Sequence, residues 1–118
     1  MIKGIGIDIV ELDRIKNSIN QNQRIIKRIL TEQEQKKFKQ IHSEQRKAEY
    51  LAGRFAAKEA YAKALGTGLG KLSFQDIQID TDALGAPRLL AAGAAGSNVF
   101  VSISHSREYV VAQVVIEE

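Results

Sequence analysis

Two carboxylates stand at positions where the surrounding pattern favours apolar side chains. Asp8 lies between Ile7 and Ile9 in an apolar N-terminal stretch, and Glu59 falls on the apolar stripe of a long predicted helix. An unpaired buried carboxylate is costly, so such a group requires a cation or a metal ion. Mg²⁺ commonly binds one or two carboxylates, keeps several waters and takes substrate phosphates as further ligands. The pair therefore predicts a Mg²⁺ site.

Each carboxylate also has a simpler interpretation. Side chains alternate along a strand, so Asp8 could face solvent. Lys63 follows Glu59 by four residues and could form an ordinary ion pair with it on the helix surface. The sequence leaves these alternatives open beside the metal site.

Groups that could bind phosphate lie close to Glu59 in the sequence. Arg54, Lys58 and Lys63 belong to the same predicted helix, which runs directly into the glycine-rich segment LGTGLGK at 65–71. Lys binds a phosphate as a point charge, Arg can do so bidentately, and glycines let backbone N–H groups approach phosphate oxygens. The segment lacks P-loop spacing and follows a helix, so a helix C-cap with a turn is the alternative. His105, at the end of a predicted strand, could contact a phosphate or carry a proton, or lie on the surface of a hairpin.

Composition excludes several classes of protein. The chain has 118 residues, no cysteine and a formal net charge of +3. No apolar run approaches the roughly 18 residues of a membrane-spanning helix, and the N-terminal sequence MIKGIGIDIV is a poor signal peptide. We therefore expect one cytoplasmic domain over residues 1–118. Residues 1–63 hold 14 Lys and Arg against 8 Asp and Glu, which suits an acidic protein, a phosphorylated cofactor or nucleic acid. Taken alone, this charge balance is explained more simply by solvated helix faces.

The elements that must position these residues follow from periodicity and caps. Thr31 and Glu34 form a capping box, and Gly66 supplies a stop signal. An N-terminal strand, a run of helices and then further strands predict an α+β fold, with a long helix packed on an antiparallel sheet. The predicted strands are 2–10, 73–79, 99–104 and 109–116, the predicted helices begin at 12, 24, 31 and 44, and ALGAP at 83–87 is a predicted turn.

Taken together, these segments resemble the holo-acyl-carrier-protein synthase family of phosphopantetheinyl transferases. The resemblance covers GIGIDIVELDR at 4–14, LTEQE at 31–35, GRFAAKEAYAKALGTGLG at 53–70 and VSISHSREYVVAQVV at 101–115. Family members of this short type form homotrimers with active sites at subunit interfaces. The implied reaction transfers the 4′-phosphopantetheine of coenzyme A to a serine of apo acyl carrier protein, releases adenosine 3′,5′-bisphosphate and supports fatty acid biosynthesis.

The resemblance also implies roles for particular residues. Asp8 and Glu59 would hold Mg²⁺ with the coenzyme pyrophosphate and waters, and Lys63 would contact that pyrophosphate. The base that accepts the serine proton would be Glu59 or a water that it activates. The resemblance implies further contacts to the coenzyme and the carrier: the loop with Gly66 and Gly68 along the coenzyme, Arg54 and His105 near the 3′-phosphate, Pro87 beside the adenine, and Arg14 against acidic residues of the carrier protein.

One position departs from the family pattern, and two other functions compete with the transferase. The turn reads Gly85-Ala86-Pro87 where the family usually has Gly-Lys-Pro, which removes a lysine near the coenzyme. A nucleic-acid binder would suit the basic half of the chain, but aromatic residues make up only 6% and show no stacking pattern on a strand. A Mg²⁺-dependent nucleotide pyrophosphatase would use the same carboxylates with water as nucleophile.

Overall fold

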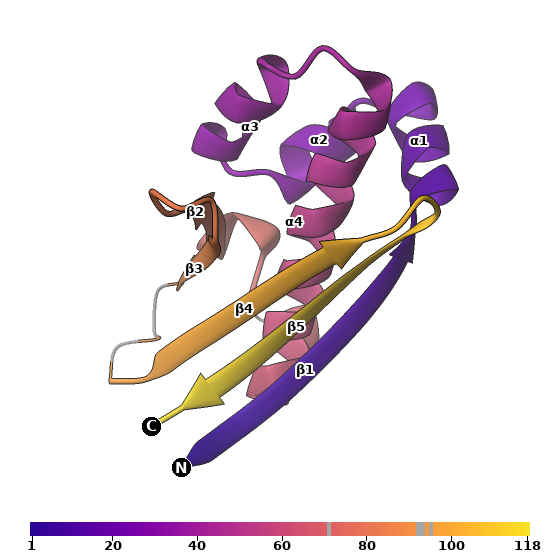
Figure 1. Cartoon of the computed structure of the whole chain (residues 1–118). Coiled ribbons are helices and arrows are strands. Elements are labelled where there is room, and N and C mark those ends of the chain that lie inside the picture. The colour runs from indigo at the N-terminus through magenta and orange to yellow at the C-terminus, as the bar shows by residue number, and fades with distance from the viewer. Residues whose placement is uncertain (71, 92–93, 95) are drawn as a thin grey trace.

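A three-stranded antiparallel sheet and one long helix form the frame of the protein. The computed structural model describes residues 1–70, 72–91, 94 and 96–118. The central strand β5 (Tyr109–Glu117) lies between β1 (Ile2–Glu11) and β4 (Asn98–His105), so β1 and β4 are the two edges of the sheet. The long helix α4 (Glu44–Leu65) runs along one face of this sheet (Figure 1). The predicted α+β class is confirmed.

Alternation along β1 decides which side chains meet α4. Ile5, Ile7 and Ile9 are exposed on the outer face, whereas Gly6 and Val10 are buried on the inner face with Asp8 between them. An ideal Cβ on Gly6 would lie 1.8 Å from the carbonyl oxygen of Ala60, so the strand can approach the helix backbone only because this position is glycine. Close packing at Gly6 brings Asp8 beside α4.

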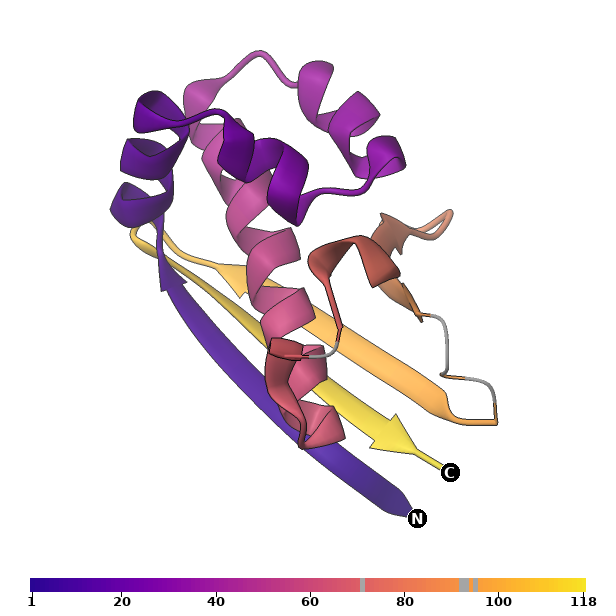
Figure 2. The same cartoon turned by 180° about the vertical axis from the view of Figure 1, so that it is seen from behind.

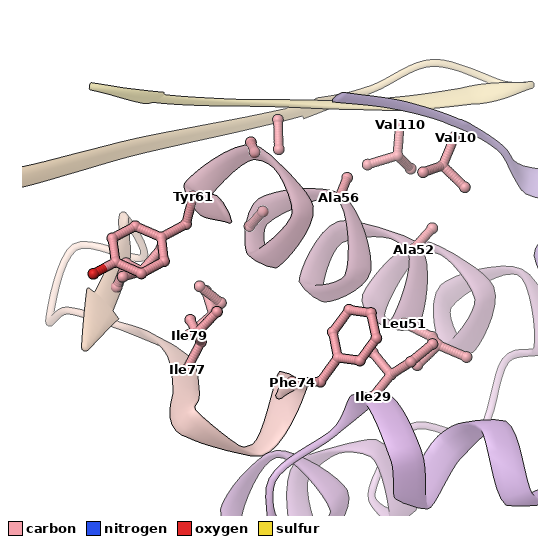
Figure 3. Packing of buried hydrophobic residues seen from close by; sticks show 14 of the residues in the cluster. Val10, Ile29, Leu51, Ala52, Ala56, Tyr61, Phe74, Ile77, Ile79 and Val110 are labelled. Atoms are coloured by element: carbon pink, nitrogen blue, oxygen red, sulfur yellow. The ribbon is translucent and has the colours of Figure 1, made fainter. Parts of the chain in front are cut away.

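Helix α4 begins at residue 44 and ends before the stop signal Gly66, as predicted. The Ser43 hydroxyl accepts a hydrogen bond from the Arg46 amide at the N-terminus, and Gly66 ends the helix in the left-handed region with φ of 81°. The helix is buried on two sides. Val10 and Val110 of the sheet face Ala52 and Ala56, while Leu51 and Tyr61 point to the layer on the other side (Figure 3).

Three short helices and a hairpin form that second layer (Figure 2). The helices are α1 (Leu12–Gln21), α2 (Arg24–Ile29) and α3 (Glu32–Lys39), and the hairpin pairs β2 (Ile77–Thr81) with β3 (Pro87–Ala91). The capping box of Thr31 and Glu34 is confirmed. Among the described residues no helix is long and apolar enough to cross a membrane.

The prediction of one strand over 73–79 was partly wrong. A 3₁₀ turn, η2 (Phe74–Asp76), takes the first half because the Ser73 hydroxyl accepts from Gln75 N and the Asp76 carboxylate accepts from Ser73 N. Strand β3 was not predicted. Lys71 and part of the small-residue segment 91–97 lie outside the described residues.

Candidate active site

Asp8 and Glu59 line the same groove. Its walls come from the end of β1, from α1 and α2, and from the middle of α4, and it encloses about 420 Å³. Arg14 of α1 and Arg28 of α2 line it as well. Asp8 and Glu59 therefore share one space with two guanidinium groups and with the exposed carboxylate of Glu11. We call this space the carboxylate groove.

The charges in the carboxylate groove are linked. The Lys63 ammonium lies 3.0 Å from Asp8 Oδ1 and also donates to the Ile7 carbonyl at 3.0 Å. Burial raises the pKa of the Glu59 carboxyl, the nearby Asp8 carboxylate raises it further, and Lys63 and Arg28 oppose the shift. Among the ion pairs of the described residues, Lys63 thus pairs with Asp8. The alternative in which it pairs with Glu59 was wrong.

The donor set of the carboxylate groove limits which metal it could hold. The described part of the chain contains no group of three or more His, Cys, Asp or Glu side chains that could hold a metal ion. Two carboxylates suit Mg²⁺, which completes its shell with water and phosphate oxygens. Burial and the nearby Asp8 carboxylate both raise the Glu59 pKa, and a bound divalent cation would offset both effects.

The Lys58 side chain is enclosed in the protein and does not reach solvent. Its prediction as a phosphate-binding group was therefore wrong. Its ammonium is fully buried and donates to the Glu34 carboxylate at 2.6 Å and to the carbonyls of Ile29 and Phe74 at 2.7 and 3.1 Å. The apolar stripe predicted only one buried face of α4. Lys58 was therefore expected on an exposed face, but α4 is buried on two sides. Glu59, expected to be buried, is only half-buried.

A second groove, of about 240 Å³, gathers three residues that the sequence singled out. Arg54 of α4, Pro87 at the start of β3 and His105 at the end of β4 all line it, and we call it the arginine groove. His105 Nδ1 lies 3.6 Å from a carboxylate oxygen of Glu49, which lines the same groove. A cavity with an arginine, a histidine and a proline can hold a phosphorylated, flat ligand.

The two grooves lie on different sides of one chain. The carboxylate groove is at the β1 edge of the sheet and the arginine groove is at the β4 edge. Gly66 and Gly68 line neither of them and lie past the C-terminal end of α4, with φ of 81° and 66°. A single chain therefore groups Asp8, Glu59, Lys63 and Arg14 apart from Arg54, Pro87 and His105.

Sequence reasoning missed two residues of the arginine groove, Arg46 and Tyr50. Their signal was available, since Arg46, Tyr50 and Arg54 follow one another at intervals of four on α4 and share a face. It also missed Arg28 in the carboxylate groove, because α2 offers several basic residues and no pattern to choose among them.

Comparisons with known proteins agree on one family. The profile of the 4′-phosphopantetheinyl transferase superfamily matches residues 4–114. The chain is 56% identical over 117 residues to a holo-[acyl-carrier-protein] synthase of Oceanobacillus iheyensis, covering 99% of this chain and 98% of the relative. It is 58% identical over 118 residues to one from a Geobacillus species, with the same coverage of both chains.

Solved structures give the same result. A holo-(acyl-carrier-protein) synthase from Bacillus anthracis, described in complex with CoA (3′,5′-ADP), matches with a TM-score of 0.92 and 50% identity over 99% of this chain and 97% of that one. The holo-[acyl-carrier-protein] synthase of Neisseria meningitidis matches with a TM-score of 0.88 and 43% identity over the whole of both chains. The chain therefore belongs to the 4′-phosphopantetheinyl transferase superfamily and, within it, to the holo-[acyl-carrier-protein] synthase family.

Proposed function

We propose that the carboxylate groove and the arginine groove hold the two ends of coenzyme A during the reaction of this family. As a member of the family, the chain is an enzyme that transfers 4′-phosphopantetheine from coenzyme A to apo acyl carrier protein, in support of fatty acid biosynthesis. The full-length family match carries this conclusion. The convergence of Asp8 and Glu59 in one groove supports the assignment of the reacting end. On this proposal, residues 1–118 act as one transferase domain in the cytoplasm.

At the reacting end, Asp8 and Glu59 bind Mg²⁺ and Lys63 contacts the pyrophosphate. When bound, Mg²⁺ neutralises the pyrophosphate and stabilises the charge that develops on the leaving phosphate. Lys63 already lies 3.0 Å from Asp8, so its charge is in place for the same phosphates. Glu59 would take the proton of the carrier serine, directly or through a water, because its carboxylate lines the groove where the serine would enter. Catalysis of this type rests on positioning and electrostatics.

At the adenosine end, Arg54 and His105 bind the 3′-phosphate and Pro87 packs against the adenine. Their gathering in one groove supports this assignment. Gly66 and Gly68 border the path of the coenzyme between the two ends. The match to a structure described with coenzyme A as 3′,5′-ADP agrees with a binding site for that half of the molecule. Ala86, beside Pro87, carries no charge, so it cannot supply the coenzyme contact that a lysine would make at this position.

A homotrimer brings the two ends together. Because the grooves lie at opposite edges of the sheet, one coenzyme reaches both only when the β1 edge of one chain faces the β4 edge of another. The outer face of the sheet supplies an interface, since Ile5, Ile7, Ile9 and Phe100 leave more than half of their surface exposed. Closed heterologous contacts of this kind form rings, and three copies make the smallest such ring.

Arg14 provides the test of carrier docking. Its side chain is exposed at the mouth of the carboxylate groove, where an acidic carrier protein would present its serine. Arg14→Glu should raise the KM for carrier protein at least tenfold, which corresponds to about 1.4 kcal/mol for one reversed contact. It should leave the KM for coenzyme A unchanged. Lys36→Glu, an equal charge reversal on the exposed side of α3, is the control. Equal changes in both KM values would exclude docking through Arg14.

The reaction itself is tested by the intact mass of an apo acyl carrier protein after incubation with the enzyme, coenzyme A and Mg²⁺. We expect a gain of one phosphopantetheine that EDTA abolishes and that a carrier with alanine for its serine does not show. Release of adenosine 3′,5′-bisphosphate without carrier protein would instead identify a hydrolase. No gain with several carrier proteins would contradict the transfer.

A further inference from the structure

The Arg54 guanidinium lies over the face of an aromatic ring. Its central carbon is 3.9 Å from the centroid of the Tyr50 ring, one helical turn earlier on α4. The Nε atom is buried and has no hydrogen-bond partner among the described residues. Within the same part of the chain, no carboxylate forms an ion pair with Arg54, although Glu49 lines the same groove. Arg54 is therefore held by the ring and keeps its charge available to a ligand.

Residues of α3 hold Tyr50 in place. Its hydroxyl donates to the Glu34 carbonyl at 3.2 Å, and its ring packs at a tilt against Phe38 with 6.2 Å between centroids. Burial raises the pKa of the Tyr50 hydroxyl, so it remains a donor at neutral pH. The Glu34 side chain is anchored by the buried Lys58 ammonium. A rigid frame thus presents the face of the Tyr50 ring to Arg54.

We propose that Tyr50 is a positioning residue for coenzyme recognition, which holds the Arg54 guanidinium open toward the 3′-phosphate. The inference rests on the proposed function of the arginine groove. Stacking on an aromatic face leaves the outer guanidinium nitrogens free for a bidentate contact with phosphate. It also keeps the side chain from turning to Glu49, whose carboxylate would compete with the ligand. Tyr50 contacts neither the pyrophosphate nor the carrier serine in this arrangement.

The test compares binding of coenzyme A with binding of 3′-dephospho-coenzyme A, measured by calorimetry on the full-length protein. Tyr50→Leu should raise the Kd for coenzyme A about threefold to thirtyfold, the range that a cation–π contact supports. The Kd for 3′-dephospho-coenzyme A should stay unchanged, because this ligand lacks the phosphate that Arg54 would bind. Tyr50→Phe keeps the ring and is the matched control, with a Kd for coenzyme A within about twofold of the parent. If the Leu variant does not fold, Tyr50→Met also removes the ring, with a flexible unbranched side chain that can adapt to the gap, and repeats the test.

A double-mutant cycle separates this inference from the proposed function. Arg54→Ala should weaken binding of coenzyme A only, and adding Tyr50→Leu to it should have no further effect. Equal weakening of both ligands by Tyr50→Leu, additivity with Arg54→Ala, or a Tyr50→Phe variant as weak as Tyr50→Leu would overturn the role of the ring. If Arg54→Ala fails to discriminate the two ligands, the assignment of the 3′-phosphate to Arg54 fails first and Tyr50 loses its role with it.

Discussion

The carboxyl of Glu59 lies in a place that favours its protonated form. Burial and the Asp8 carboxylate both raise its pKa above the ordinary value, and Lys63 and Arg28 offset only part of this effect. The folded protein therefore binds the Glu59 proton more tightly than the unfolded chain does. Without a metal ion, the free energy of unfolding falls as pH rises through the raised pKa.

Substituting Glu59 by glutamine should remove this penalty. In EDTA at pH 8, Glu59→Gln should unfold at a temperature equal to or slightly above that of the parent, and the difference should vanish near pH 4, where Glu59 itself is protonated. The effect is small because the side chain is partly exposed. Thermal unfolding followed by circular dichroism between pH 4 and pH 8 measures it.

Glu108→Gln removes an exposed carboxylate of the β4–β5 hairpin and controls for the loss of one negative charge. Added Mg²⁺ should stabilise the parent and the Glu108 variant but not the Glu59 variant. A Glu59→Gln protein that is less stable than the parent at pH 8 in EDTA would show that Glu59 is a structural partner in the fold.

Single residues were predictable where their type conflicted with their surroundings. Asp8 and Glu59 stand out as carboxylates in apolar patterns. Arg54 and His105 were candidates for phosphate binding by residue type, Pro87 came from the resemblance alone, and all three line one groove. The buried Lys58 was not predictable, because only the packing of α2, α3 and η2 against α4 shows that its ammonium is enclosed. The sequence periodicity of one helix cannot report what covers its second side.

At the scale of elements, the contact between β1 and α4 depends on glycine. A methyl group at Gly6 would lie 1.8 Å from the backbone oxygen of Ala60, and backbone cannot move aside as a side chain can. Gly6→Ala should therefore lower the free energy of unfolding by more than about 3 kcal/mol, beyond the usual range for overpacking. Urea denaturation measures the loss.

Gly53→Ala is the matched substitution for this test. Gly53 is equally buried, but its new methyl would lie 3.4 Å from a methyl group of Ile103, an ordinary contact. In mid-helix the change should be neutral or stabilising by up to about 1 kcal/mol. If Gly6→Ala changes stability as little as Gly53→Ala does, the strand and helix can separate without harm, against the close packing described.

The buried pair of Lys58 and Glu34 joins elements that are distant in sequence. The Glu34 carboxylate accepts from the amides of Thr31 and Ile79, and the Lys58 ammonium reaches carbonyls at the end of α2 and in η2. Lys58→Met leaves the Glu34 carboxylate enclosed without its cation and should cost about 3–5 kcal/mol of stability. Burial lowers the pKa of Lys58, with Glu34 opposing, so enclosure is already a strain on this charge.

A double variant tests the reason for that loss. Lys58→Met with Glu34→Gln removes both charges and keeps an oxygen for one backbone amide, so it should be more stable than Lys58→Met alone when both are unfolded in urea. A double variant less stable than the single one would mean that packing, and not the unpaired charge, dominates at this position.

The order of elements was largely predictable, and the small hairpin was not. Caps at Thr31, Ser43 and Gly66 fix helix ends through local chemistry that is visible in sequence. Strand β3 was not predicted because its five residues show little alternation of polar and apolar types, and only one of them, Leu89, is buried. The pairing of β2 with β3 depends on the turn at Gly85 and on the surface beneath, which is a property of the assembled layers.

At the scale of the whole molecule, the position of the two grooves argues for an assembly. Residues 1–118 bury a core on both sides of α4 and still leave an apolar row across the outer sheet face, in which Ile5, Val115 and Phe100 are neighbours on adjacent strands. If the two grooves hold the two ends of one coenzyme, as proposed, a single chain carries only half of each site. The proposed trimer would then supply both the cover for the apolar row and the second half of the site.

Mixed oligomers of two inactive variants test this arrangement. Glu59→Ala should lose turnover at every site that receives its carboxylate groove, and Arg54→Ala should bind coenzyme A poorly at every site that receives its arginine groove. If each site draws the two grooves from different chains, subunits exchanged at equal amounts should rebuild about a quarter of the sites with both native groups. The transferase assay should then recover a corresponding part of the parent activity.

Neither variant chain holds both native residues. Recovered activity can therefore come only from sites that two different chains build together. The control mixes the two intact oligomers without dissociating them first. Because no subunits exchange, the transferase activity should not recover. Phe100→Asp places a charge in the apolar row and should both reduce the molar mass in light scattering and abolish the complementation. Exchanged oligomers that stay inactive would place the whole site within one chain, and the two grooves would then have to be bridged across the sheet by the coenzyme itself.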